Sequence, residues 1–144
     1  MENTYQCTTL PNGLRVASEK LGGQLLADES LYWNGLRDHT AKFFQDNTPL
    51  WRISLPAAHQ PLDINGEWLV EWGGAQRWLK TNAASKIIRA QAAKAGGHAT
   101  LFRGGDRQGE IFHPLSPALA ALHQRLKAAF DPHGLLNPGR MFAD

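Results

Sequence analysis

Arginine is the residue type through which this sequence could most readily handle a small anion. Arg37, Arg52 and Arg77 each lie within a predicted helix or strand rather than in a loop. A guanidinium group presents a planar fork of N–H donors that suits a carboxylate. Structural roles are the alternative, because Trp33 can cover the stem of a solvated Arg37 and Glu71 can pair with Arg77 across a hairpin. The sequence leaves both possibilities open.

The histidines and the single cysteine form no recognisable catalytic or metal-binding set. No Ser–His–Asp set or Cys–His pair can be argued, and Cys7 stands alone. Apart from His98, which is discussed below, the histidines share no ligand spacing: His39, His59, His113, His123 and His133. We therefore predict no metal site.

Apolar periodicity predicts alternating strands and helices along the chain. Strands are predicted over residues 5–10, 50–55, 67–72, 76–80 and 98–103. Helices are predicted over residues 14–21, from about 28 to before 49, over 82–95 and over 117–130. In the second strand, a period of two places Trp51, Ile53 and Leu55 on one face.

Capping residues mark where three of these helices begin. Asp28 or Ser30 is expected to cap the second helix, and Asn82 the third. Ser116 followed by Pro117 is the clearest start, since proline favours the first helical position. Gly96-Gly97 should end the third helix, whose apolar stripe is predicted to be Ile87, Ile88 and Ala92.

This order of elements predicts an α+β fold. Helices would pack on one face of a largely antiparallel sheet, in a ferredoxin-like arrangement with a C-terminal helix and an extended tail from residue 131. The length of 144 residues suits one domain. With 42% hydrophobic and 19% charged residues, the composition is that of a globular chain rather than a disordered one.

Charge and hydropathy exclude two classes of partner. The net charge is only +2 and the basic residues are dispersed, so we expect no nucleic-acid binding. No apolar run is long enough for direct membrane insertion, and the first residues do not resemble a secretion signal. These features predict a cytoplasmic protein.

Four segments carry a resemblance to a known family. They are Leu-Tyr-Trp-Asn-Gly-Leu-Arg-Asp at 31–38, Leu-Trp-Arg-Ile-Ser-Leu-Pro at 50–56, Glu-Trp-Gly-Gly-Ala-Gln-Arg-Trp at 71–78, and Phe-Asp-Pro-His-Gly-Leu-Leu-Asn-Pro-Gly-Arg at 130–140. Together they resemble the C-terminal cap of the E-subunit family of bacterial glycolate oxidases. That family belongs to the vanillyl-alcohol oxidase type of flavoenzymes. The last segment is similar to the closing signature of the superfamily.

The resemblance implies FAD-dependent oxidation of glycolate to glyoxylate in the full-length complex. The cap would lack the N-terminal FAD-binding domain, so FAD is not expected on this chain alone, and the chain is expected to be inactive alone. The tail would return to that domain, with Asn137, Gly139 and Arg140 near the flavin. The alternative is that Asn-Pro-Gly is only a turn at a domain end.

The resemblance also implies a substrate-binding role for Arg37, Arg52, Arg77 and His98. Gly97-His98-Ala99 is similar to the start of the metal-binding stretch of metal-using relatives, but the second histidine of that stretch is replaced here by Gly105. One histidine is too few for such a metal site. The residue that would act as catalytic base is not identified.

Partners follow from the same resemblance. They would be the N-terminal FAD-binding domain, a paralogous FAD subunit and an iron–sulfur subunit, which could hold the protein at the periphery of the inner membrane. The other hypothesis is a stand-alone ferredoxin-like module that binds a small ligand or a protein, because such folds serve many functions.

Overall fold

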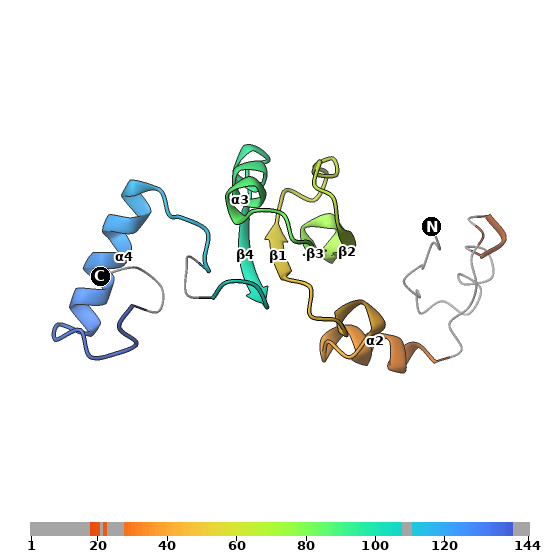
Figure 1. Ribbon diagram of the computed structural model, residues 1–144, viewed down its shortest axis with the longest axis horizontal. Coiled ribbons are helices and arrows are strands. Elements are labelled where there is room, and N and C mark those ends of the chain that lie inside the picture. The colour runs from red at the N-terminus through yellow and green to blue at the C-terminus, as the bar shows by residue number, and fades with distance from the viewer. Residues whose placement is uncertain (1–17, 21, 23–27, 108–110, 140–144) are drawn as a thin grey trace. The chain divides into compact units, whose positions relative to one another are not determined.

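The computed structural model describes residues 18–20, 22, 28–107 and 111–139 (Figure 1). The chain forms two compact units, Met1–Asp46 and Asn47–Asp144, and each is described by itself. The strand predicted over residues 5–10 lies outside the described residues. Of the helix predicted over 14–21, residues 18–20 are described and are helical.

Helix α2, Glu29–Arg37, is the longest element among the described residues of the first unit. The Asp28 carboxylate accepts a hydrogen bond of 2.9 Å from the Leu31 N–H, so the prediction that Asp28 caps this helix is confirmed. The indole of Trp33 lies edge-on to the ring of Tyr32, with ring centroids 5.1 Å apart.

The end of α2 differs from the prediction, which continued the helix almost to Pro49. His39 has a φ of 55°, in the left-handed region that ends helices. The N–H groups of Thr40 and Ala41 both donate to the carbonyl of Gly35, which closes the last turn. A separate 3-10 turn, η1 (Lys42–Phe44), follows. The long helix was wrong because local backbone conformation at residue 39 overrides the apolar spacing.

The second unit is built on a four-stranded antiparallel sheet. Its strands are β1 (Leu50–Ser54), β2 (Glu67–Glu71), β3 (Gln76–Lys80) and β4 (His98–Arg103). The strand order is β2-β3-β1-β4 (Figure 1). The four corresponding strand predictions are confirmed, as is the hairpin between β2 and β3, which turns through η2 (Trp72–Gly74).

One face of this sheet packs against helix α3 (Ser85–Lys94) and holds the core. Alternate residues of each strand point to this face, as the period-two pattern of β1 predicts. The cluster contains Trp51, Ile53, Leu55, Leu62, Ile64, Leu79, Ile88, Ala92, Ala95, Ala99 and Leu101.

The start of α3 corrects two predictions. The helix begins at Ser85 after Ala84, and no side chain caps it. Asn82 is not the cap, because the hydroxyl of Thr81 accepts from the Ala83 N–H and shapes the turn before the helix. Ile88 is buried in the core as expected, whereas Ile87 is 52% exposed.

The end of α3 agrees with the sequence. Gly96 adopts a φ of 75°, and the Gly97 N–H donates to the carbonyl of Ala92. Gly97 also lies directly against β1, since a Cβ atom placed on it would be 2.0 Å from the carbonyl oxygen of Ser54. Only glycine fits here without moving the backbone.

The α+β class is confirmed by the antiparallel sheet and its helices. A ferredoxin-like core has the order β-α-β-β-α-β. The described residues between β1 and β2 contain no helix, so this unit has the order β-β-β-α-β up to β4. The α+β class is thus confirmed, but the ferredoxin-like part of the prediction is not.

Helix α4, Pro117–Phe130, follows the sheet in the chain. The Ser116 hydroxyl accepts from the Leu119 N–H, which confirms the predicted cap. Within this fully described helix, no side chain is buried. None of the helices in the described part of the chain has the length and apolar character that crossing a bilayer requires.

We predict that Gly97→Ala lowers the free energy of unfolding by more than about 2 kcal/mol, because its methyl group must displace the β1 backbone. Urea unfolding followed by circular dichroism measures the change. Gly35→Ala is the matched control, since its Cβ meets nothing nearer than 3.5 Å and alanine favours a helix. Equal effects of the two variants would contradict the close approach at Gly97.

Candidate functional site

The sheet face opposite α3 carries the polar side chains that are candidates for function. In the register of β1, Arg52 lies opposite Trp78 on one side and Thr100 on the other. Ser54 lies in the same way between Gln76 and His98. Because side chains alternate along a strand, all of these residues share the face that α3 does not cover. We call it the polar sheet face.

A chain of hydrogen bonds crosses three strands on the polar sheet face. Arg52 Nε on β1 donates to Gln76 Oε1 on β3 at 2.9 Å, and Gln76 Nε2 donates to Glu71 Oε2 on β2 at 3.0 Å. The same Glu71 oxygen accepts from the indole Nε1 of Trp78 at 2.5 Å. Trp78 is buried, whereas Arg52 is exposed, so the chain runs from an interior anchor to a surface cation.

The arrangement suits the binding of a small anion. The bond to Gln76 uses Nε of Arg52, and within the described residues no recorded hydrogen bond engages its two Nη atoms. These two atoms form the edge of the guanidinium that can donate two parallel hydrogen bonds to a carboxylate. The structure therefore places Arg52, one of the predicted substrate-binding residues, where it could do so.

His98 lies at the first position of β4 and its side chain is exposed on the polar sheet face. Its ring centroid is 6.4 Å from that of His113, whose Nδ1 accepts from the Ala99 N–H. Burial lowers the pKa of His113, and the charges of His98 and Arg89 lower it further. Among the described residues, no three His, Cys, Asp or Glu side chains gather as metal ligands would.

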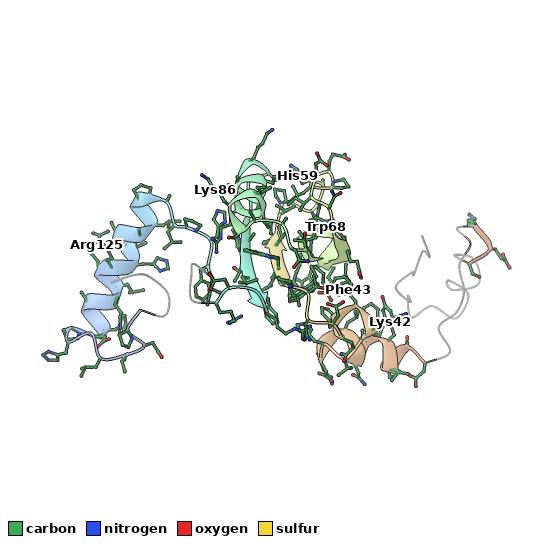
Figure 2. The ribbon with its side chains drawn as sticks, in the orientation of Figure 1. Lys42, Phe43, His59, Trp68, Lys86 and Arg125 are labelled. Atoms are coloured by element: carbon green, nitrogen blue, oxygen red, sulfur yellow. The ribbon has the colours of Figure 1, made fainter. Side chains whose placement is uncertain are left out.

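Arg77 lies on the opposite, α3-facing side of the sheet. Arg77 is 6% exposed, and its guanidinium donates to the backbone carbonyls of Gly74, Gln60 and His59 (His59 is labelled in Figure 2). Arg77 pairs in register with Val70 and Glu71 with Gln76, so of the structural roles left open for Arg77 the cross-strand pair with Glu71 is not the one that forms. These bonds tie two loops to β3 and are typical of a structural arginine. A substrate-binding role for Arg77 stays a prediction.

Arg37 belongs to the first unit and is exposed at the end of α2. Its Nε and Nη2 each donate at 2.8 Å to the carboxylate of the neighbouring Asp38. This pair raises the pKa of Arg37 and lowers that of Asp38, in both cases chiefly through the hydrogen bonds. A substrate carboxylate would have to displace Asp38, and the substrate-binding role of Arg37 stays a prediction.

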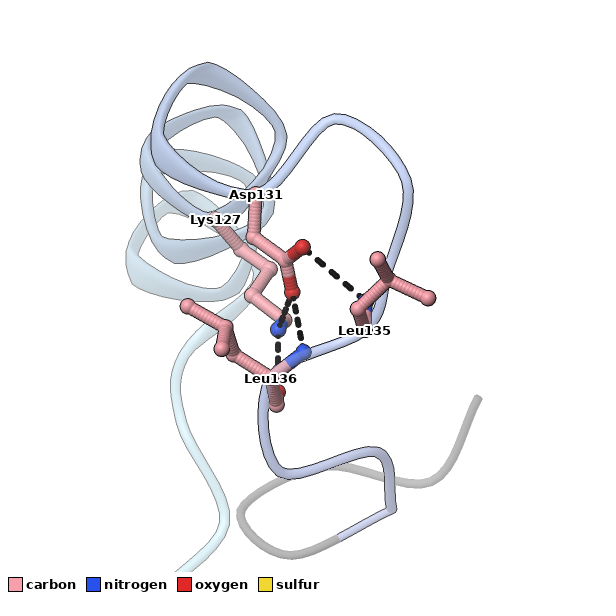
Figure 3. A network of polar contacts seen from close by, with 4 residues as sticks. All are labelled: Lys127, Asp131, Leu135 and Leu136. Carbon is pink, nitrogen blue, oxygen red and sulfur yellow. Dashed lines mark hydrogen bonds and ion pairs between the residues drawn. The ribbon is translucent and has the colours of Figure 1, made fainter.

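The Asp131 carboxylate organises the tail that follows α4 (Figure 3). Its Oδ1 accepts from the Leu135 N–H at 2.9 Å and its Oδ2 from the Leu136 N–H at 2.8 Å. Lys127, one turn earlier in α4, donates both to Asp131 and to the Leu136 carbonyl. The bond from Lys127 lowers the pKa of Asp131 to about 2, assisted by the two N–H groups and opposed by burial.

This network leads directly to the residues predicted to lie near a flavin. Asn137 has a left-handed φ of 48° and Gly139 one of 64°, and both residues are exposed. Asparagine tolerates this conformation better than most residues. Arg140 lies outside the described residues. The cofactor-binding role of all three stays a prediction.

Sequence reasoning missed Glu71, Gln76 and Trp78 as members of the candidate site. The signal was present in the predicted hairpin, because a turn centred on residues 73–74 sets Glu71 opposite Gln76. What the sequence could not supply was the neighbour of β3. Only the pairing of β1 with β3 brings Arg52 within reach of Gln76.

A hollow of about 310 Å³ lies apart from the polar sheet face, beside the first turn of α3. Its walls include Trp51 and Leu101 from the core side of the sheet, and Ser85 and Arg89 from the helix. The guanidinium of Arg89 lies over the Trp51 ring, 5.5 Å from its centroid. The hollow contains none of the predicted site residues.

We expect the tail network to persist until Asp131 is protonated. Since its folded pKa is below the ordinary value, the stabilisation is present above pH 4 or so and is lost as the pH falls through about 2. In NMR titrations, the amide signals of Leu135 and Leu136 should move with a midpoint near that value. Asp131→Asn should abolish this transition and speed hydrogen exchange at both amides.

The control for this titration is Asp28→Asn, which removes another carboxylate that accepts from a backbone N–H at a helix end. It should alter the Leu31 amide and leave the tail amides unchanged. A midpoint for Leu136 near pH 4, the ordinary range for aspartate, would show that the network does not form.

Comparison with known proteins gives two matches. Residues 75–141 match the family model described as FAD linked oxidases, C-terminal domain. The chain is also 46% identical over 131 residues to glycolate oxidase subunit GlcE of Escherichia coli (strain K12). This alignment covers 91% of the chain but 36% of the relative, so the chain spans about a third of that protein's length. No solved structure was found to match the chain.

The family match covers β3, α3, β4 and α4 together with the tail that Asp131 organises. The alignment with the relative covers most of the rest of the chain, and an identity of 46% implies a common fold. Residues 75–141 therefore carry the C-terminal domain of FAD-linked oxidases, in a chain that is similar along most of its length to part of glycolate oxidase subunit GlcE.

Proposed function

We propose that this chain is the cap of a glycolate oxidase subunit and contributes one wall of the cavity in which glycolate is oxidised to glyoxylate. The observation that carries the proposal is the position of Arg52, an exposed cation on the polar sheet face of a chain related to glycolate oxidase subunit GlcE. Glycolate is a small 2-hydroxy acid, and its carboxylate is the group that a guanidinium would recognise.

In this proposal, Arg52 binds the carboxylate of the substrate and holds its α-carbon in a constant position. His98 lies on the same face, on the neighbouring strand β4, where it pairs with Ser54, two residues from Arg52. From there it could contact the hydroxyl or the carboxylate of the substrate. The rings of Trp78 and Phe102 pack edge-on, with centroids 5.0 Å apart. They would form an apolar boundary beside Arg52 and His98. The cap would thus orient the substrate and exclude water.

FAD would be held chiefly by the part of the protein that this chain does not cover in its relative. The proposed contact groups agree with that division, because the guanidinium of Arg52 suits a carboxylate and the amide of Asn137 suits a ring edge, rather than a diphosphate. Asn137, Gly139 and Arg140 are the residues of this chain that would contact the cofactor. The chemistry that bound FAD supplies is acceptance of a hydride equivalent from the substrate α-carbon.

Other subunits complete the proposed assembly. The relative is named as a subunit, which supports an oxidase made of several chains. We propose a paralogous FAD subunit and an iron–sulfur subunit as partners, the latter accepting the electrons that leave the flavin. Either FAD-bearing subunit could be the one that performs the oxidation.

Arg52→Gln should raise the KM for glycolate about tenfold or more in the assembled oxidase, because it removes a charged hydrogen-bond donor from the carboxylate. Glycolate-dependent reduction of an artificial electron acceptor measures the effect. The kcat should change less than KM, since the substitution weakens binding in the ground state and in the transition state alike.

Lys86→Gln is the matched control. Lys86 is an exposed cation in the first turn of α3 (Figure 2). It therefore belongs to the side of the sheet that α3 covers, and Arg52 faces the other side. Its loss should leave KM within about twofold of the original value. If Arg52→Gln behaves like Lys86→Gln, the polar sheet face is not the wall of the substrate cavity.

A further inference from the structure

We infer that Gln76 and Glu71 are positioning residues that fix the orientation in which Arg52 meets a substrate carboxylate. Both residues lie on the polar sheet face and act through Arg52 rather than by touching the substrate. This positioning role rests on the proposed role of Arg52, and it goes further by naming what controls that role.

The chemistry of the four side chains allows only one direction for the hydrogen-bond chain. Arg52 and the Trp78 indole can only donate, and the Glu71 carboxylate can only accept. The amide of Gln76 must therefore turn its oxygen toward Arg52 and its nitrogen toward Glu71, as the distances of 2.9 and 3.0 Å show. An amide held between a cation and a carboxylate has no second orientation of comparable energy.

The anchor of this chain is rigid. Trp78 is 4% exposed, lies in the inner strand β3, and donates to the same Glu71 oxygen that accepts from Gln76. Glu71 and Gln76 are also direct partners in the β2–β3 register. Each member of the chain thus lies on a strand, and three paired strands hold their spacing.

The consequence falls on Arg52, whose long side chain would otherwise sample many rotamers. A bond to Nε fixes the plane of the guanidinium and leaves the outer edge, with Nη1 and Nη2, to face a ligand. When a carboxylate binds to a preoriented guanidinium, the arginine side chain loses less conformational entropy than it would if binding had to order it. Gln76 and Glu71 should therefore strengthen substrate binding without contacting substrate.

The test is Gln76→Met in the assembled oxidase, which keeps the length of the side chain and removes both hydrogen bonds. We expect the KM for glycolate to rise about fivefold to tenfold with kcat within about twofold. Gln91→Met is the matched control, because Gln91 is also partly buried and donates one hydrogen bond, to the Asp63 carbonyl on the core side. It should leave KM unchanged.

Two further variants show whether the effect passes through Arg52 and Glu71. Added to Arg52→Gln, the Gln76→Met change should raise KM no further, since the group that it positions is already absent. Glu71→Gln keeps an oxygen that can accept from both Trp78 and Gln76, so it should retain most of the affinity, whereas Glu71→Leu should lose it as Gln76→Met does.

A readout independent of turnover is hydrogen exchange at the Arg52 Nε–H, followed by NMR in the purified chain. Exchange should be slow in the original protein and in Gln91→Met, and faster in Gln76→Met and Glu71→Leu. Equal exchange in all four proteins would overturn the inference.

The outcomes separate this inference from the proposed function. If Arg52→Gln raises KM but Gln76→Met does not, Arg52 binds the substrate without help and only the positioning role is wrong. If Gln76→Met raises KM equally with and without Arg52, the positioning role is also wrong. If neither variant changes KM although exchange at Nε responds to Gln76→Met, the hydrogen-bond chain stands and the substrate assignment fails.

Discussion

The antiparallel pairing of β1 with β3, with Arg52 opposite Trp78, is the constraint on which the rest of the second unit depends. It directs Trp51 and Ile53 into the core against α3, and it directs Arg52 to the other face. Because side chains alternate with a period of two, a slip of one residue would bury Arg52 and expose Ile53. The fold and the candidate site are therefore two results of one register.

Arg52 and Arg77 show how this register assigns different roles to one residue type. They lie on adjacent strands, but Arg77 faces the core side, where three backbone carbonyls take up its donors. A buried cation in that position satisfies loop carbonyls that would otherwise lack partners. Arg52 faces the opposite side and is held at one nitrogen by a side-chain amide. Only the second arrangement leaves part of the guanidinium available for a ligand.

The tail is organised by local contacts instead. Asp131 accepts from N–H groups four and five residues ahead, and Lys127 joins it from the preceding helical turn. All of these groups lie within ten residues of one another along the chain. The shape in which Leu136 and Asn137 are presented is thus encoded by the closing segment itself, whatever surface that segment meets.

Local signals in the sequence determined the strands of the sheet, the caps at Asp28 and Ser116 and the glycine end of α3, because each depends on residues near in the chain. They also carried the resemblance to FAD-linked oxidases, through the closing segment and the hairpin segment at 71–78. A local left-handed turn at His39, which the apolar spacing does not reveal, ends α2 at Arg37. Tertiary structure alone decided that Arg77 turns inward. It likewise decided that Arg52, Gln76, Glu71 and Trp78 form one chain of hydrogen bonds. Arg52 and Gln76 are separated by 24 residues, and only the choice of strand neighbours, set by burial of the whole apolar face, brings them to 2.9 Å.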